Sequence, residues 1–377
     1  MSESSNGQGS NRTMLPIQNP LYETNIELAN DSLLRTLSDS FKGQSVPYFE
    51  IISRYFEKIH ETNSLLPKDK KYQFVLEAIT KLWEDSQKNP SIFKSAKDFE
   101  PVLQRIHGYR DHFIHSFNTF VIGHYILNKL YEIDPENCFK QNSNHPNLTW
   151  MLASTFHDVA YPLQEMEEWT NDICKTFLGI NPMLSMGINE IVPPIYIDFM
   201  RMICQEHRQP RSAHQSVSFA SLDWSFYSEI NQKFVAKDHG VLGGIILAHL
   251  LAVRSGFAEG DRKWDFLLDH LPACHAIILH TMTEKINFSR HPFAFLLALC
   301  DEIQDVGRPS RLEKQDNLLI LDLNIQKVNV PEICFKVQVS DKRRALIAGN
   351  LSKNRLSTSG KIKIVFQDGS GNELYSL

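Results

Sequence analysis

The sequence has few cysteines, no long apolar run and no large excess of charge of either sign. Its six cysteines, at positions 138, 174, 204, 274, 300 and 334, form no Cys-x-x-Cys pair. This usage argues against a disulfide framework and against a thiolate zinc site. Reduced thiols of this kind predict a cytoplasmic protein.

The longest apolar run, residues 241–253, is thirteen residues long and contains a histidine. A membrane-spanning helix needs about 20 apolar residues, so the run predicts a buried helix and no membrane partner. The net charge of -5, from 39 basic and 44 acidic residues, does not indicate nucleic-acid binding. Residues 1–20 lack the pattern of a signal peptide and are rich in serine, asparagine and glycine, which predicts a disordered tail.

Most of the chain from 21 to 310 has apolar residues every three or four positions, as in "YFEIISRYFEKIHETN" and "GVLGGIILAHLLAV". After "GRPS" the stretches "LLILDLNIQKV", "EICFKVQVS" and "KIKIVFQDG" alternate as strands do, with one helix predicted at "DKRRALIAGNLS". The fold class is therefore mainly α: an all-helical body over 21–310 and a small α+β domain over 311–377. The first two strands are expected to pair antiparallel. Ligand binding, covering of the active site and a subunit contact in a homo-oligomer stay open as roles of the small domain.

Histidine and aspartate side chains stand at the borders of the apolar helical runs. His115 lies early in one helix, His157 and Asp158 end a second, His239 opens a third, His280 ends a fourth, and Asp301 ends "FLLALCD". Taken singly, each is as well explained by a buried histidine bonded to a carbonyl or by an aspartate capping a helix. Together they predict five helix borders that meet at one cavity.

The order His, His-Asp, His, His, Asp resembles the HD superfamily of metal-dependent phosphohydrolases. The matching stretches are "HSFNTFVIG", "FHDVAYPL", "KDHGVLGG", "AIILHTM" and "LALCDEIQDVGRP", and the resemblance covers 105–310. It implies a helical HD-domain body and an enzyme that cleaves a small-molecule phosphoester, above all of a nucleotide.

The resemblance also implies a ligand set for two divalent transition metals per chain. His115, His157, Asp158 and Asp301 would hold the first ion, and His239 and His280 would complete the second site with Asp158. Imidazole and carboxylate together suit Mn, Fe, Co, Ni or Zn. Neighbouring side chains on a helix point about 100° apart, so Asp158 is placed to bridge to the second ion while His157 binds the first. Two such ions activate a water or hydroxide and clamp phosphoryl oxygens.

Two further residues are catalytic candidates beside Asp158. Asp111 precedes His115 by four residues, so it either orients that imidazole or is an acidic charge at a helix N-terminus. His112 either reaches a substrate phosphate or leaving group, or is a core histidine.

Three residues are weaker candidates for substrate binding. Lys237 either contacts an anion at a helix N-terminus or is solvated. Gln304 and Arg308 fall on one helical stripe with Asp301 and Asp305, on a helix that Gly307 and Pro309 are expected to end. Arg308 either contacts a phosphate, pairs with Asp305 or lies on the surface.

Several residues near these motifs are interpreted as structural. Gly240, Gly243 and Gly244 are close-packing positions, because no strand precedes them as a phosphate loop requires. His124, His249 and His275 fit helix faces turned away from the site.

Two other functions fit the same residues. Some HD-fold proteins use a di-iron form of the ligand set to activate O₂, and spacing does not separate them from hydrolases. The third reading is a non-catalytic sensor or interaction module, for which loss of a ligand would be the signature. All six ligand positions are filled here.

Overall fold

A computed structural model describes the chain in thirteen ranges: 33–37, 39–43, 45–61, 68–87, 112–161, 163–164, 175–176, 195–208, 223–254, 263–307, 319–327, 329–338 and 356–377. The predicted tail over 1–20, the helix predicted at "DKRRALIAGNLS", and the candidates Asp111 and Arg308 lie outside these ranges.

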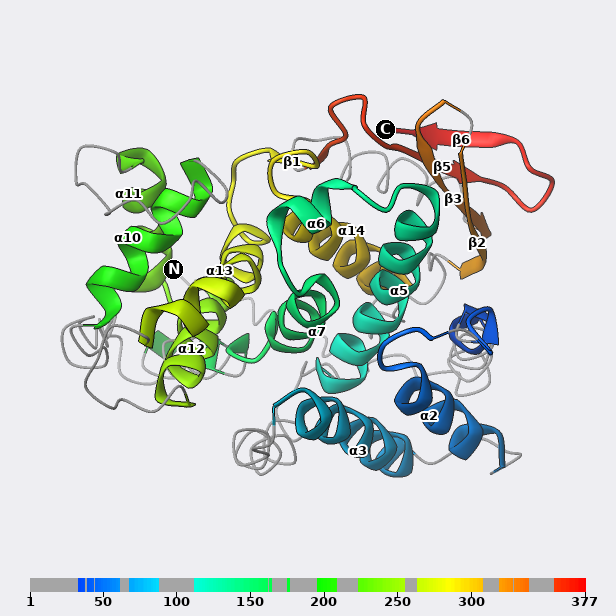
Figure 1. Cartoon of the computed structure of the whole chain (residues 1–377), viewed down its shortest axis with the longest axis horizontal. Coiled ribbons are helices and arrows are strands. Elements are labelled where there is room, and N and C mark those ends of the chain that lie inside the picture. Colours follow the sequence, from blue (N-terminus) through cyan, green and yellow to red (C-terminus); the bar gives the residue numbers. More distant parts are fainter. Residues whose placement is uncertain are drawn as a thin grey trace, which may run out of the picture.

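The described part of the body is built from helices (Figure 1). They are α2 (Phe49–Glu61), α3 (Lys68–Gln87), α5 (His112–Ile133), α6 (Cys138–Asn142), α7 (Pro146–Phe156), α10 (Ile195–Arg208), α11 (Trp224–Val235), α12 (His239–Arg254), α13 (Lys263–Leu279) and α14 (Pro292–Gly307). Helix α7 packs against α5, α13 and α14, while α12 lies along α13 and α2 packs on α3. The mainly helical character predicted from the sequence is confirmed.

Helix α7 sits in the middle of the body because it is mostly apolar and the hydroxyls of Ser154 and Thr155 donate to its own backbone carbonyls. Every residue from Thr149 to Phe156 is buried, and Pro146 stands at the first helical position, which suits proline. Trp150 donates a hydrogen bond from Nε1 to the carbonyl of Phe120 in α5, at 3.0 Å. A Cβ on Gly123 would lie 1.9 Å from the Trp150 ring. The missing side chain at Gly123 therefore lets α5 approach the end of α7.

Glycines also bring α12 close to α13 and α7. A Cβ on Gly244 would lie 2.5 Å from Cγ1 of Ile278, and one on Gly243 would lie 3.2 Å from the carbonyl oxygen of Phe156. A Cβ on Gly240 would meet Thr281 at 2.5 Å. The interpretation of these three glycines as close-packing positions is confirmed.

The C-terminal region forms a four-stranded sheet in the order β2-β3-β5-β6, from Leu319–Lys327, Pro331–Gln338, Lys363–Gln367 and Glu373–Ser376. Strands β2 and β3 pair antiparallel, as predicted, and β5 and β6 do the same. Strands β3 and β5 run parallel, which requires a crossover connection between them. Strand β6 was not expected from the sequence.

The sheet is joined to the helical body. The prediction of an all-helical body is wrong in one detail, because β1 (Ile286–Asn287) lies between α13 and α14 and pairs parallel with β4 (Leu356–Ser357). Leu323 and Phe335 belong to the same buried cluster as the helices, and the Tyr125 hydroxyl of α5 donates to the Leu323 carbonyl at 3.4 Å. The change from helices to strands near 310 thus does not separate two cores.

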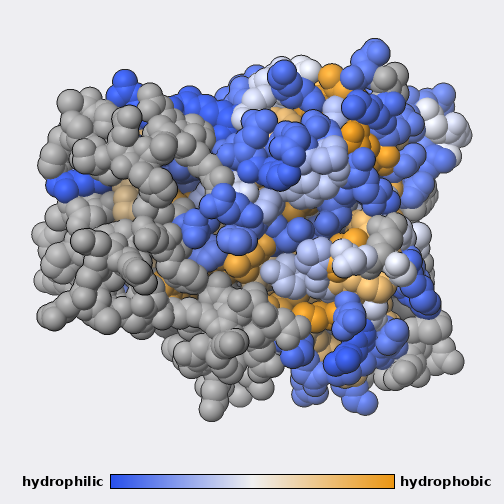
Figure 2. All heavy atoms as spheres, in the orientation of Figure 1, coloured by the Kyte–Doolittle hydropathy of each residue, from blue (hydrophilic) through white to orange (hydrophobic). Residues whose placement is uncertain are grey.

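The described surface is mostly hydrophilic on the visible face, with apolar side chains in small separate groups (Figure 2). Among the described helices, none is by itself long and apolar enough to cross a membrane. One consecutive pair, Trp224–Val235 with His239–Leu251, passes by length and composition together but is bent by 97°.

Candidate metal centre

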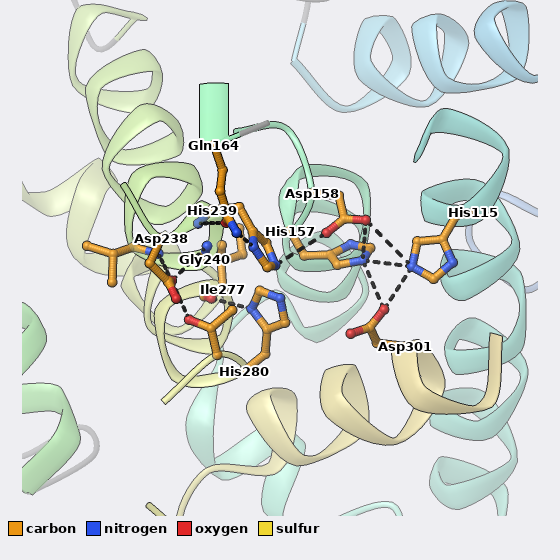
Figure 3. A network of polar contacts seen from close by, with 12 residues as sticks. His115, His157, Asp158, Gln164, Asp238, His239, Gly240, Ile277, His280 and Asp301 are labelled. Atoms are coloured by element: carbon orange, nitrogen blue, oxygen red, sulfur yellow. Dashed lines mark hydrogen bonds and ion pairs between the residues drawn. The ribbon is translucent and has the colours of Figure 1, made fainter. Parts of the chain in front are cut away.

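The six side chains predicted as metal ligands come together between α5, α7, α12, α13 and α14 (Figure 3). His115 is in the first turn of α5, His157 caps the C-terminus of α7, His239 is the first residue of α12, and His280 directly follows α13. Asp301 ends the apolar run of its helix, as predicted, and α14 continues to Gly307, where the sequence predicted its end. It lies where the buried run from Phe293 to Cys300 gives way to partly exposed residues.

The first group of ligand atoms is formed by His115, His157, Asp158 and Asp301. Nε2 of His115 lies 3.2 Å from Nε2 of His157 and 2.8 Å from Oδ1 of Asp301. Oδ2 of Asp158 is 3.7 Å from both imidazole nitrogens. Donors around one ion with bonds of about 2.0–2.2 Å are separated by roughly 3 Å, so these distances match one coordination sphere.

The second group is formed by Asp158, His239 and His280, whose ligand atoms all lie within 4.8 Å of one another. Oδ1 of Asp158 is 3.6 Å from Nε2 of His239, while Oδ2 of the same carboxylate faces the first group. Asp158 therefore presents one oxygen to each group. The structure places this carboxylate between two groups of residues able to hold a metal ion.

The hydrogen bonds at the far side of each ring set the tautomer of three histidines. Nδ1 of His157 lies 2.8 Å from the Ser154 carbonyl, Nδ1 of His280 contacts the Ile277 carbonyl, and Nδ1 of His239 lies 3.0 Å from Oε1 of Gln164. Since these oxygens only accept, we assign the proton of each neutral ring to Nδ1. Nε2 then carries a lone pair directed into the centre, as a metal ligand requires.

The buried atoms of the centre fit a cation. Nε2 of His280 is buried and has no hydrogen-bond partner among the described residues. Such an orphaned acceptor costs free energy unless a ligand satisfies it. A metal ion would satisfy it.

The pKa values of the centre are shifted in opposite directions. Burial opposes the charge on His157, but Asp158 and Asp301, with the Ser154 carbonyl, outweigh it and raise the pKa of His157 to about 9. Burial and the neighbouring His239 lower the pKa of His280 to about 4. Without a metal, the carboxylates thus hold a proton on His157 where a cation would replace it.

Gln164 was missed by the sequence analysis. Its Oε1 accepts hydrogen bonds from both the backbone N–H of His239, at 3.1 Å, and the His239 ring. Nothing in the local pattern around "PLQEM" distinguishes it from a surface glutamine. Asp238 was also missed, although an aspartate directly before a glycine-containing apolar helix is a recognisable N-cap signal.

The structure describes only part of the remaining catalytic and substrate-binding candidates. The side chains of His112, at the start of α5, and of Gln304, in α14, lie outside what the structure describes. Lys237 holds its ammonium group 5.6 Å from the centre of the Phe234 ring, and its own backbone has φ of 54°.

The histidines interpreted as structural lie away from the six ligands. His124 is buried and packs against Phe120, and His275 is buried beside His207. His249 is exposed. Burial and ring contacts support the structural interpretation for His124 and His275, and the exposed His249 keeps it as a prediction.

Comparison of the chain with protein-family models, with curated proteins and with solved structures finds no match. The residues themselves therefore carry the chemical interpretation. Imidazole nitrogen and carboxylate oxygen donors, with no thiolate among them, suit Mn, Fe, Co, Ni or Zn.

Proposed function

We propose that this chain is a metal-dependent phosphohydrolase that uses two divalent ions to cleave a phosphoester, with nucleotides as the expected substrate class. One observation carries the proposal: the Asp158 carboxylate presents a different oxygen to each of two histidine-containing groups. The order of these residues along the chain, which resembles that of the HD superfamily, supports it.

The charge of the centre favours an anionic substrate. Its donors are the carboxylates of Asp158 and Asp301 and the imidazoles of His115, His157, His239 and His280. Two carboxylates contribute -2, and two divalent ions contribute +4, so the loaded centre carries a net charge of +2. A phosphoester anion would offset this charge inside a largely buried site.

The two groups are unequal, and this suggests where substrate binds. Asp301 adds a second carboxylate to the first group, beside two buried histidines. Among the described residues the second group has three donors, and the His239 side chain is 21% exposed. The Asp301 side chain of the first group is 24% exposed, so exposure does not separate the groups. The smaller number of protein donors leaves room for a phosphoryl oxygen and a water at the second group.

The ligand residues hold and orient, and the ions provide the chemistry. When bound, two divalent ions would polarise the phosphoryl oxygens and lower the pKa of an attacking water. Asp158 would fix the distance between the two positions. Gln164 would hold the His239 ring so that Nε2 points inward.

The direct test is metal content measured beside phosphate release. Purified protein is loaded with Mn²⁺ and assayed on a nucleotide panel and on bis-p-nitrophenyl phosphate. We expect about two ions per chain and metal-dependent product release that His157→Ala and Asp158→Ala abolish while the helical circular dichroism spectrum is kept. Full metal content and turnover in either variant would refute the site.

Other results would replace the proposed function. Iron at the two positions, with O₂ uptake and no hydrolysis, would favour the di-iron oxygenase. No metal under any loading condition would favour the sensor or interaction module.

A further inference from the structure

A polar contact joins the two helices that supply the histidines of the second group. Asp238 directly precedes His239, and Thr281 directly follows His280. The Thr281 hydroxyl donates to Oδ1 of Asp238 at 2.6 Å. The start of α12 is thus tied to the end of α13 one residue away from each ligand.

The Asp238 carboxylate is held from several sides. Its Oδ1 also accepts from the backbone N–H groups of Gly240 and Val241, at 3.1 and 3.2 Å, which makes it the N-cap of α12. Its Oδ2 accepts from Lys233 Nζ at 3.0 Å, and the same ammonium donates to the Thr281 carbonyl at 2.6 Å. Lys233 therefore reinforces the junction from α11.

Close backbone packing allows this junction to form. A Cβ on Gly240 would lie 2.5 Å from the Thr281 hydroxyl oxygen and 2.9 Å from the Ile277 carbonyl oxygen. Any larger residue at 240 would push the first turn of α12 away from the end of α13. The separation of His239 and His280 depends on the same approach.

We propose that Asp238 and Thr281 are positioning residues that set the spacing of His239 and His280 and so assemble the second metal position. Neither side chain belongs to the two groups able to hold an ion. Their hydrogen bond holds the start of α12 and the residue after α13 at a fixed distance from each other. The proposal rests on the proposed binuclear centre but concerns its second ion alone.

The consequence is a selective loss of one ion. The hydrogen bonds of the junction join α11, α12 and the residue after α13, whereas the first group draws its histidines from α5 and the end of α7. Removing the hydroxyl of Thr281 should leave binding of the first Mn²⁺ unchanged. Binding of the second should weaken about ten- to hundredfold, as expected for losing a hydrogen bond to a charged group.

The test is calorimetric titration of the metal-free full chain with Mn²⁺ for wild type, Thr281→Val, Thr281→Ala and Thr281→Ser. Valine matches threonine in shape, alanine removes the hydroxyl without adding bulk, and serine keeps it. Thr283→Val is the matched control, because its hydroxyl donates to Glu229 at 2.8 Å on the same segment without touching a ligand. We expect valine and alanine to weaken only the second ion, and serine and the control to bind as wild type does.

The outcomes separate this proposal from the proposed function. If the valine or alanine variant binds two ions with wild-type affinities, the positioning role of Asp238 and Thr281 is refuted and the proposed hydrolase function is not affected. If wild type binds two ions but releases no phosphate, the proposed hydrolase function is refuted. The selective loss of the second ion in the Thr281 variants would still test the positioning role. Equal weakening of the binding of both ions in these variants, or fewer than two ions bound by wild type, would refute the positioning role.

Discussion

The Nε2 atoms of His115 and His157 lie 3.2 Å apart in the interior, although the two residues are 42 positions apart in the chain. If both nitrogens carry a lone pair, they repel at this distance unless a proton or a metal ion lies between them. The adjacent carboxylates of Asp158 and Asp301 favour a positive charge there. The centre can therefore hold either a proton or a metal ion at this position.

Asp158 and His239 should differ in their effect on metal content. Asp158→Ala removes a donor from both groups, whereas His239→Ala removes one from the second group alone. We expect Asp158→Ala to lose both Mn²⁺ ions and His239→Ala to keep one, with hydrolysis lost in both. Inductively coupled plasma mass spectrometry of loaded, desalted protein measures this. Equal metal content in the two variants would show that Asp158 is not shared.

Gln164 should affect the second ion without being a ligand. Gln164→Ala removes the acceptor for Nδ1 of His239, which frees the ring to turn and to change tautomer. Loss of such a partner typically lowers metal affinity about 10–100-fold. Titration with Mn²⁺ should show this for the second ion only. Gln164→Glu keeps an acceptor in place and should restore binding, and failure to do so would argue against the orienting role.

Gly123 should be sensitive to the smallest substitution. Gly123→Ala places a Cβ at 1.9 Å from the Trp150 ring in a packed interior. Overpacking of this kind costs roughly 1–3 kcal/mol of unfolding free energy, measured as a lower urea midpoint. Because the clash is with one side chain, adding Trp150→Leu should recover part of the loss in a double-mutant cycle. Strictly additive effects would contradict the proposed contact.

Acid should destabilise the fold through buried histidines outside the centre. Burial lowers the pKa of His124 to about 4, and burial with nearby His207 lowers that of His291 to about 2. Burial with neighbouring His291 holds the pKa of His275 well below its ordinary value. In the unfolded chain these groups titrate near pH 6.5, roughly, so below that pH only the unfolded state gains protons.

The contribution of these histidines to the free energy of unfolding should therefore be fully present above about pH 6.5. It should decrease as the pH drops, by about 1.4 kcal/mol per pH unit for each such histidine. Urea unfolding at several pH values between neutral and mildly acidic measures the slope. His124→Asn should flatten it by the share of one histidine. An unchanged slope in the His124 variant would refute the assignment.

The helical class was accessible from sequence because apolar spacing is a local pattern, and the six candidate ligands were accessible because their order along the chain resembles a family pattern. Apolar residues at helical spacing mark α7 and α12, and the polar exceptions at their borders mark His157 and His239. The end of α14 at Gly307 was also accessible, because a glycine followed two residues later by a proline is a local stop signal.

What the sequence did not show depends on contacts between distant segments. Gln164 meets His239 across 75 positions, and Thr281 meets Asp238 across 43. The parallel pairing of β1 with β4 joins two-residue strands that have no periodicity to detect. Such partners are chosen by packing of the whole body, which a local pattern does not encode.

The central claim is that two ions share the Asp158 carboxylate, and electron paramagnetic resonance of Mn²⁺-loaded protein tests it most directly. We predict the spectrum of an exchange-coupled pair at full loading, as expected for ions about 3.5–4 Å apart. It should vanish in Asp158→Ala and give way to an isolated-ion signal in His239→Ala. A six-line spectrum of isolated Mn²⁺ in the fully loaded wild type would contradict the shared carboxylate.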